Sequence, residues 1–438
     1  MQIQRRILRD IFEALIEQPL VLVEGPPRSG KTSLVAQIQR TASTGALSLD
    51  AGSPASRHIL FEPELTLSEG RGLAGRILVV DRADLEPACI PPLAAFAASG
   101  KARGGGVVLL GTAFPEAALA AAFAATRERS PDAAMEASSG TELPALRLSA
   151  PNPTAPDLAA PALLHLGPLS LTEAGWESRS RHWLRGGYPE AFCAANDEAA
   201  LAWLRGYLDS LADSRLAASG LPWAPLRTRN LLAMLAEAHA SCLNENAMAA
   251  SLGLSRPTVA RAVAALKRAG ILRGLPAIAA SADAGVGTDP SPGKRQRSVR
   301  SEKLYIKDSG LLHALLGFKG SDDLAGSARL AASWEGYVVE LVLAELPPGI
   351  EAAHYRSKDG ASLELVFSKG GEPQGGASIR WAKQGHSAPR GAVNAASALG
   401  LEGLPRLLVL PESEEAELKD GFTAIGLRRF LERVRDLA

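Results

Sequence analysis

The residues with the clearest chemistry lie near the amino terminus, in the segment VLVEGPPRSGKTSL at residues 21–34. Gly25, Gly30, Lys31 and Thr32 follow the spacing G-x-x-x-x-G-K-[ST] after a short apolar run. In such a loop, glycines let successive backbone N–H groups point at a phosphate chain, and the following helix adds positive partial charge. The lysine reaches the outer phosphates, and the threonine hydroxyl can ligate Mg²⁺. We therefore predict a nucleoside triphosphate site.

The alternative for this segment is an ordinary glycine-rich turn, but the motif and both of its flanks agree with a phosphate loop. The predicted binding residues are Gly25, Pro26, Pro27, Arg28, Ser29, Gly30, Lys31, Thr32 and Ser33. Asp81 follows the apolar residues 77–80, and an acid at the end of a buried strand beside a phosphate loop can hold Mg²⁺ through water. Thr32 and Asp81 are therefore the predicted metal ligands.

Length and composition limit the possible classes. A chain of 438 residues is long enough for about two to four domains. Lys and Arg number 47 and Asp and Glu also 47, so any nucleic-acid surface must be local. Three widely spaced cysteines indicate a reducing compartment, without a disulfide framework or a zinc site. With no signal-peptide pattern and no apolar run near the ~18 residues that span a bilayer, we expect a cytoplasmic protein without a membrane partner.

The elements around the loop alternate between strands and helices. Residues 2–17 have helical periodicity, and residues 46–50, 77–80 and 107–110 read as strands. This alternation predicts an α/β domain with a mainly parallel sheet. Ligands of such sheets bind at the carboxyl ends of the strands, where Gly25, Asp81 and Thr112 all fall.

From residue 227 the pattern changes to short helices. Asn244 and Ser255 are good caps for the second and third of them, and Pro257 fits the first turn of the third. Two strand-like pieces follow at residues 271–277 and 302–308, and a polar loop joins them. Three helices and a hairpin predict a winged helix.

Residues 227–310 carry 13 Lys and Arg against 6 Asp and Glu, in a chain that is otherwise balanced. Such an excess would supply salt-sensitive affinity for double-stranded DNA. The predicted DNA contacts are Ser255, Arg256, Thr258 and Arg261 on the third helix and Lys294, Arg295, Arg297 and Arg300 in the wing. The alternative is a winged helix that makes only protein contacts, with a solvated basic loop.

Several segments, in this order along nearly the whole chain, carry a family resemblance: GPPRSGKTSL, ILVVDRADL, LLGTAF, LGPLSLTEAG, GGYPEAF, KLYIKDSGLL, WEGYVVE and HYRSKDGASLELV. On these segments the chain resembles a family of bacterial and archaeal P-loop proteins. Their AAA+-type ATPase domain is followed by a winged helix and a C-terminal domain built like a PD-(D/E)XK nuclease. The resemblance implies that ATP or ADP is bound with Mg²⁺, that Asp81 is the Walker B acid, that Thr112 is the sensor residue acting in catalysis with it, and that the chain can form homo-oligomers.

The fold class that follows is α/β. We expect a P-loop NTPase parallel sheet over residues 1–165, a helical lid region over 166–225, a winged helix over 226–310 and a small mixed restriction-endonuclease-like domain over 325–438. The last segment itself reads as a helix followed by strands, a further helix, a strand and a final amphipathic helix, which fits a separate mixed α/β unit.

Three departures from the family pattern bear on activity. Arg82 replaces the glutamate that usually follows the Walker B acid, and Ala160 and Pro161 stand where the family has a Gly-Arg pair. In the last domain Glu364 can serve as one metal ligand, but Arg380 replaces the next acid, which predicts an inactive nuclease. An ATPase with weak hydrolysis and a non-hydrolysing nucleotide switch therefore both stay open, and a small-molecule kinase is a third alternative.

Overall fold

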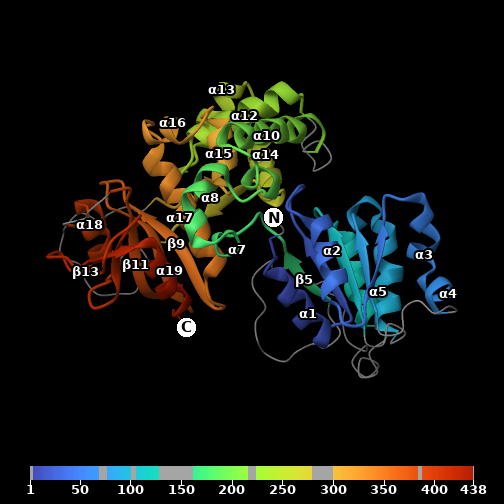
Figure 1. Cartoon of the computed structure of the whole chain (residues 1–438). Coiled ribbons are helices and arrows are strands. Elements are labelled where there is room, and N and C mark those ends of the chain that lie inside the picture. The colour runs from blue at the N-terminus through green and yellow to red at the C-terminus, as the bar shows by residue number, and fades with distance from the viewer. Residues whose placement is uncertain are drawn as a thin grey trace, which may run out of the picture. The chain divides into compact units, whose positions relative to one another are not determined.

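The computed structural model describes residues 3–68, 76–99, 105–127, 161–215, 223–278, 299–382 and 387–437 (Figure 1). The chain divides into two compact units, Met1–Ala174 and Gly175–Ala438, and each is described by itself. Lys294, Arg295 and Arg297, which are predicted DNA contacts, lie outside the described residues.

The first unit is built on a parallel sheet. Its strands in the described residues are β1 (Leu20–Glu24), β2 (Ala46–Asp50), β3 (Ile77–Asp81), β4 (Val107–Gly111) and β5 (Ala162–His165), in the order β2-β3-β4-β1-β5. All the pairings between them are parallel. The prediction of an α/β fold with a mainly parallel sheet is confirmed. The apolar runs of β1, β3 and β4 are continuous because helices cover both faces.

Two sets of helices cover this sheet, with α1 and α2 on one face and α5 on the other (Figure 1). Alternate residues of β1 point to opposite faces, so Leu22 packs in the core with Phe96 of α5, and Val23 packs with Ile11 of α1 and Ile38 of α2. The helices are α1 (Ile7–Glu17), α2 (Lys31–Thr41), α3 (Arg57–Phe61), α4 (Pro63–Ser68), α5 (Ile90–Ala98), α6 (Glu116–Arg127) and α7 (Leu171–Ala174).

The first helix begins later than its apolar periodicity predicts. It starts at Ile7, whereas the sequence suggested residue 2. The side-chain amide of Gln37 accepts a hydrogen bond from the Arg5 N–H and donates one to the Ile3 carbonyl, at 3.0 Å each. These backbone groups are therefore bonded to α2 and do not continue the helix.

The second unit begins with helices and a small antiparallel sheet. Its helices up to residue 325 are α8 (Arg179–Arg185), α9 (Pro189–Phe192), α10 (Asp197–Ser210), α12 (Pro225–Glu237), α13 (Glu245–Leu252), α14 (Arg256–Arg268), α15 (Ser309–Leu315) and α16 (Ser321–Ala325). The strands β6 (Ser241–Cys242), β7 (Leu272–Leu275) and β8 (Lys303–Ile306) pair in the order β6-β8-β7. The Asn244 and Ser255 side chains cap α13 and α14, as predicted. The winged-helix assignment itself stays a prediction.

One hydrophobic core joins the helices predicted as a lid to the elements predicted as a winged helix. Tyr188 and Leu204 pack in the same cluster as Leu235, Val259 and Leu304. The core explains why the apolar positions of α10, α12 and α14 face one another. The predicted domain boundaries at residues 166, 226 and 325 stay predictions.

The rest of the second unit is a mixed sheet with helices. Its elements are α17 (Leu330–Glu345), β9 (Ile350–Arg356), β10 (Ser362–Lys369), β11 (Glu372–Ile379), α18 (Arg390–Ala398), β12 (Arg406–Leu410), β13 (Ala416–Glu417), β14 (Thr423–Gly426) and α19 (Leu427–Arg435). The strand order is β13-β14-β12-β11-β10-β9, with antiparallel β9, β10 and β11 and parallel β11, β12 and β14. A mixed α/β unit at this end of the chain was predicted, whereas β13 and β14 were not.

His313 is a fully buried histidine that links three helices of this unit. Its Nδ1 lies 2.9 Å from the Leu184 carbonyl oxygen and its Nε2 lies 2.7 Å from Ser333 Oγ. A carbonyl only accepts, so Nδ1 carries the proton and Nε2 accepts from the serine. Ser333 Oγ in turn accepts from Trp183 Nε1 at 3.0 Å. Burial lowers the pKa of His313 to about 4, so the ring is neutral in the folded state at neutral pH.

We predict that acid destabilises this unit through His313. Its folded pKa lies below the ordinary value of 6.5, so its contribution is fully present above pH 6.5 and is lost as the pH falls toward 4. Within that window the free energy of unfolding should fall by ~1.4 kcal/mol per pH unit for each such histidine. Denaturant unfolding at several pH values measures this slope.

The His313→Gln variant should be less stable than the wild type at pH 7 and should show a shallower slope, by about one proton. His58→Gln, at an exposed position on α3 of the other unit, is the matched control for replacing a histidine with glutamine. Parallel curves for the wild type and His313→Gln would contradict the assignment.

Candidate functional site

The predicted phosphate loop connects the end of β1 to the start of α2. The Gly25 N–H donates to the Gly111 carbonyl at 3.1 Å, which ties the loop to the end of β4. A Cβ at Gly25 would lie 2.2 Å from the Leu166 carbonyl oxygen, so this position accepts only glycine. The first glycine of the motif is therefore required by the close approach of the chain after β5.

The loop has the backbone conformation of an anion-binding turn. Arg28 and Gly30 have positive φ, at 63° and 98°, and Gly30 immediately precedes α2. Alternation between right- and left-handed residues turns successive N–H groups toward one concave side. The first N–H groups of α2 also lack intrahelical partners and carry the positive end of the helix dipole. This cradle suits a phosphate chain.

The charged and hydroxyl groups of the loop converge with the end of β3. The Thr32 hydroxyl donates to Asp81 Oδ2 at 2.8 Å, so the two predicted metal ligands lie together. Lys31 Nζ donates to the carbonyls of Gly25 and Pro26 at 2.6 and 2.9 Å. A hydroxyl and a carboxylate form a donor set for a hard cation such as Mg²⁺, and the ammonium is beside the cradle. The residues present therefore fit a magnesium nucleotide.

Thr112 and Arg82 also lie at the carboxyl ends of the strands, beside the loop. Thr112 follows the last residue of β4, whose partner in the sheet is Glu24 of β1. Arg82 follows β3 in a left-handed conformation, and its guanidinium forms an ion pair with Asp50 at the end of β2. The hydrogen bond from Arg82 lowers the pKa of Asp50. Arg82 therefore serves as a counter-ion and cannot accept a proton from water.

Asp84, two residues after Arg82, approaches the site only through a sharp bend of the chain after β3. The left-handed φ of Arg82 is such a bend, and a short 3₁₀ turn over Ala83–Leu85 follows it. As a result Asp84 lies against Gly111, where an added Cβ would be 3.1 Å from the Asp84 Cβ. Asp84 and the loop therefore both lie at the carboxyl ends of the strands.

Arg5 is a functional candidate that sequence reasoning missed. Its guanidinium is buried and donates to the Ser29 carbonyl inside the loop at 2.6 Å. The sequence gave no signal for it, because Arg6 and Arg9 are charged residues of the same kind in the same segment.

The third helix of the predicted DNA surface is α14, and all four contacts predicted on it lie within the described residues. Ser255 Oγ caps α14 by accepting from the Thr258 N–H at 3.4 Å, and the two hydroxyls also bond to each other at 2.8 Å. Arg256 forms an ion pair with Glu245 of α13 at 2.9 Å. Arg261 and Arg300 are exposed. Part of this set therefore has a structural partner already, while the exposed arginines face solvent.

In the second unit, the acids of the predicted nuclease-like site are bonded to other groups of the protein. Glu364 accepts hydrogen bonds from Ser378 Oγ, the Ile379 N–H and Arg380 Nη1, at 3.0, 3.1 and 3.2 Å. Glu335, on the neighbouring α17, pairs with Lys303 Nζ at 2.6 Å. Across the described parts of the chain, no group of three or more His, Cys, Asp or Glu side chains is placed to hold a metal ion. Cationic side chains therefore neutralise these two acids.

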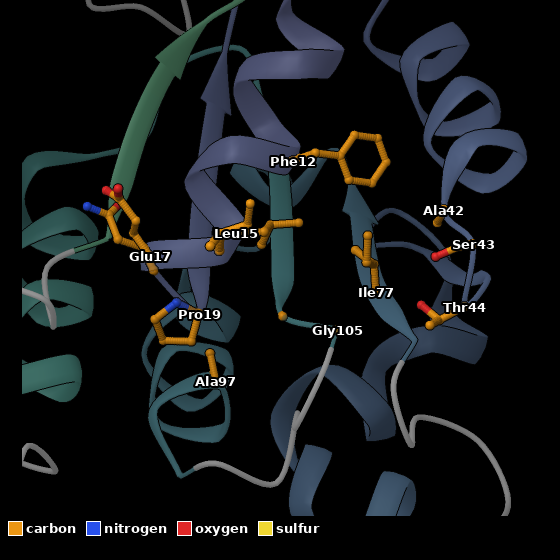
Figure 2. Close-up of a pocket in the computed structure, with 13 residues that line it drawn as sticks. Phe12, Leu15, Glu17, Pro19, Ala42, Ser43, Thr44, Ile77, Ala97 and Gly105 are labelled. Carbon is orange, nitrogen blue, oxygen red and sulfur yellow. The ribbon is translucent and has the colours of Figure 1, made fainter.

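A separate hollow of about 580 Å³ lies at the amino ends of the strands of the first sheet, opposite to the loop. Figure 2 shows it between Phe12, Leu15 and Pro19 near β1 and Ile77 at the start of β3. Ligands of parallel α/β sheets bind beyond the carboxyl ends of the strands, whereas this hollow is at the amino ends. It is therefore not the candidate site.

The chain is 31% identical over 362 residues to the uncharacterised protein Rv2008c of Mycobacterium tuberculosis and, to the same extent, to Mb2031c of Mycobacterium bovis. Each match covers 83% of this chain and 70% of the relative. The chain therefore belongs to the family of these mycobacterial proteins. A model described as a domain of unknown function, DUF8612, matches residues 177–322, which lie in the second unit.

Two solved structures are similar at a lower level. The Walker-type ATPase PABY2304 of Pyrococcus abyssi has a TM-score of 0.40 and 14% identity, with 72% of this chain and 96% of that chain covered. The ORC1 protein of Aeropyrum pernix, solved in complex with DNA, has a TM-score of 0.24 and 12% identity, with 72% and 94% covered. At these scores neither likeness says what this chain binds. Within the described ranges, every helix is too short or too polar to cross a lipid bilayer.

We predict that Gly25→Ala disrupts the loop, because its Cβ would lie 2.2 Å from the Leu166 carbonyl oxygen. The first unit should lose about 1–3 kcal/mol of stability, the usual cost of overpacking. Gly167→Ala is the matched control, since nothing lies within 4 Å of a Cβ there. Denaturant unfolding compares the two variants, and equal stabilities would show that the close contact is absent.

Proposed function

We propose that this chain binds ATP with Mg²⁺ through residues 25–33 and Asp81, as an AAA+-like P-loop protein. The observation that carries the proposal is the 2.8 Å hydrogen bond from Thr32 Oγ1 to Asp81 Oδ2 at the start of α2. It joins the loop to the strand that supplies the acid, as a magnesium triphosphate site requires. ADP would bind through the same backbone groups.

Each residue of the loop has a distinct task in this proposal. The backbone N–H groups between Gly25 and Ser33 bind phosphate oxygens. Lys31 exchanges its contacts with the Gly25 and Pro26 carbonyls for the outer phosphates. Thr32 and Asp81 hold Mg²⁺, which neutralises phosphate charge when bound. Thr112, after β4, is the proposed polar sensor of the outer phosphate.

Hydrolysis is slow in this proposal, since Arg82 cannot position and activate a water molecule and is paired with Asp50. Asp84, beside Gly111, is the carboxylate available for that task. Nucleotide binding would then be coupled to rearrangement of domains or subunits. The ion pair of Arg82 favours the alternative, a switch that holds nucleotide without hydrolysing it and acts through protein partners.

We further propose that residues 226–310 form a winged helix that contacts double-stranded DNA through Arg256, Arg261, Arg300 and the basic residues 294, 295 and 297. Support comes from the excess of basic residues in this range and the exposure of Arg261 and Arg300. Residues 325–438 would act as an inactive nuclease-like scaffold. The contact of Arg380 with Glu364 supports this, because a guanidinium takes the carboxylate that would bind a metal.

Titration calorimetry with Mg–ATP, together with phosphate release in the same sample, tests the nucleotide site. The wild type should bind, and Lys31→Ala should bind at least about tenfold more weakly because charged hydrogen bonds are lost. Arg40→Ala, on the exposed part of the same helix, is the control and should bind like the wild type.

The phosphate trace separates the two versions of the proposal. Release above that of Lys31→Ala, and lost in Asp84→Asn, would support the ATPase. A flat trace with measurable affinity would support the switch. Absence of binding by the wild type would refute both.

For DNA, we predict that replacing Lys294, Arg295, Arg297 and Arg300 with alanine makes binding less sensitive to salt. Each lost phosphate contact should reduce the slope of log K against log salt by about 0.9. A control with the same change of charge replaces the exposed Arg9, Lys319, Lys358 and Lys369. Fluorescence anisotropy with duplex DNA at several salt concentrations measures the slopes, and equal slopes for the two variants would exclude the wing.

A further inference from the structure

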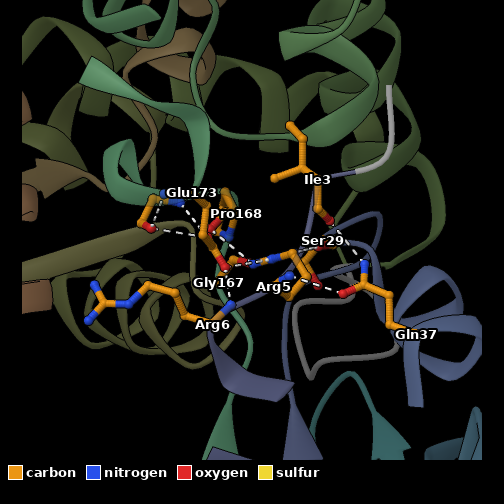
Figure 3. A network of polar contacts seen from close by, with 9 residues as sticks. Ile3, Arg5, Arg6, Ser29, Gln37, Gly167, Pro168 and Glu173 are labelled. Atoms are coloured by element: carbon orange, nitrogen blue, oxygen red, sulfur yellow. Dashed lines mark hydrogen bonds and ion pairs between the residues drawn. The ribbon is translucent and has the colours of Figure 1, made fainter. Parts of the chain in front are cut away.

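The buried guanidinium of Arg5 joins the phosphate loop to the chain that follows β5. Arg5 is 5% exposed, and its Nη1 donates to the Ser29 carbonyl at 2.6 Å. Nη2 donates to the Gly167 carbonyl at 2.7 Å, and Nε donates to Glu173 Oε1 at 3.0 Å. Figure 3 shows Arg5 at the centre of these contacts. One planar side chain therefore holds two segments far apart in sequence.

Glu173, the acid that faces Arg5, is itself held in a fixed position. Its Oε2 accepts from the Ser170 N–H at 2.8 Å, while Ser170 Oγ accepts from the Glu173 N–H at 3.3 Å. This reciprocal pair is a capping box for the short α7. The Arg6 N–H adds a bond of 2.8 Å to Oε1 (Figure 3). The sequence LSLTE thus places a rigid carboxylate against the buried guanidinium.

The bond to the Ser29 carbonyl decides where the next N–H of the loop points. In a trans peptide the C=O and the following N–H point in opposite directions. With the Ser29 carbonyl held by Arg5, the N–H of Gly30 points away from Arg5. Gly30 has the left-handed φ of 98° that completes the cradle. Without Arg5, rotation of this peptide could turn a carbonyl oxygen toward the phosphates, where it would repel them.

We propose that Arg5 is a positioning residue for the nucleotide site: it orients the Ser29–Gly30 peptide for phosphate binding without touching the nucleotide, and Glu173 acts through it. This inference rests on the proposed binding of ATP. It also assigns a task to the LGPLSLTEAG segment, whose Gly167 and Pro168 carbonyls and Glu173 carboxylate fix the guanidinium. A buried charge needs such a partner, because an isolated one is costly.

The test is calorimetry of Mg–ATP and ADP on the full chain, with Arg5→Ala, Arg5→Lys, Glu173→Gln and the double variant Arg5→Ala/Glu173→Gln. Circular dichroism first sets a temperature at which every variant is folded. Arg5→Ala should weaken binding at least about tenfold, since charge-assisted hydrogen bonds within the loop are lost. Arg5→Lys keeps the charge but not the planar fork, so it should weaken binding less. Arg9→Ala, at an exposed position on α1, should bind like the wild type.

The double variant distinguishes positioning from general stability. If Glu173 acts through Arg5, Glu173→Gln should weaken binding in the wild type and cost nothing further in the Arg5→Ala background. Additive losses would overturn the inference, as would wild-type affinity in Arg5→Ala. If Arg5→Ala does not fold, wild-type affinity in Arg5→Lys overturns it. A wild type that binds no nucleotide instead refutes the proposed function, which separates the two failures.

Discussion

The chemistry of the first unit depends on the position of β1 between β4 and β5. In parallel pairing, Glu24 at the end of β1 has Gly111 on one side and His165 on the other. The loop that follows must therefore turn in the space left by two neighbouring chains. The Gly111 carbonyl accepts its first N–H, and the Leu166 carbonyl excludes a side chain at Gly25. The sheet thus constrains the predicted phosphate loop in addition to the loop's own sequence.

Pairing of carboxylates decides which chemistry stays possible. Asp81 accepts from Thr32 and from the Arg82 N–H, and both are contacts that a metal site can retain or exchange. Asp50 and Glu364, by contrast, form ion pairs with Arg82 and Arg380. These two arginines stand where the family resemblance led us to expect acids. A cation that is part of the chain cannot be replaced by Mg²⁺ without leaving a charge unpaired. The conformation of the loop therefore suits the proposed phosphate binding, whereas the guanidinium groups oppose metal binding at Asp50 and Glu364.

The second unit combines segments that motifs alone would separate. The core that contains Tyr188 also contains Val259 and Leu304, so the helices after Gly175 share their packing with α14 and β8. The match to DUF8612 over residues 177–322 spans the same elements. The helices α9, α10 and α14 and the strand β8 therefore share one closely packed core, so a change in the packing of α14 is transmitted to α9 and α10.

The sequence by itself determined the local features: the loop motif, the buried strands β1, β3 and β4, and the caps at Asn244 and Ser255. These follow from residue types within a few positions, since a strand buried on both faces must be apolar and a cap needs a nearby side-chain oxygen. The two-residue, exposed β13 gave no such pattern. Only the tertiary structure decided that Asp84 reaches Gly111, that Arg82 turns to Asp50, and that Arg5 holds Ser29. Each of these contacts joins residues that periodicity does not relate, and each depends on where the sheet and its turns bring the backbone.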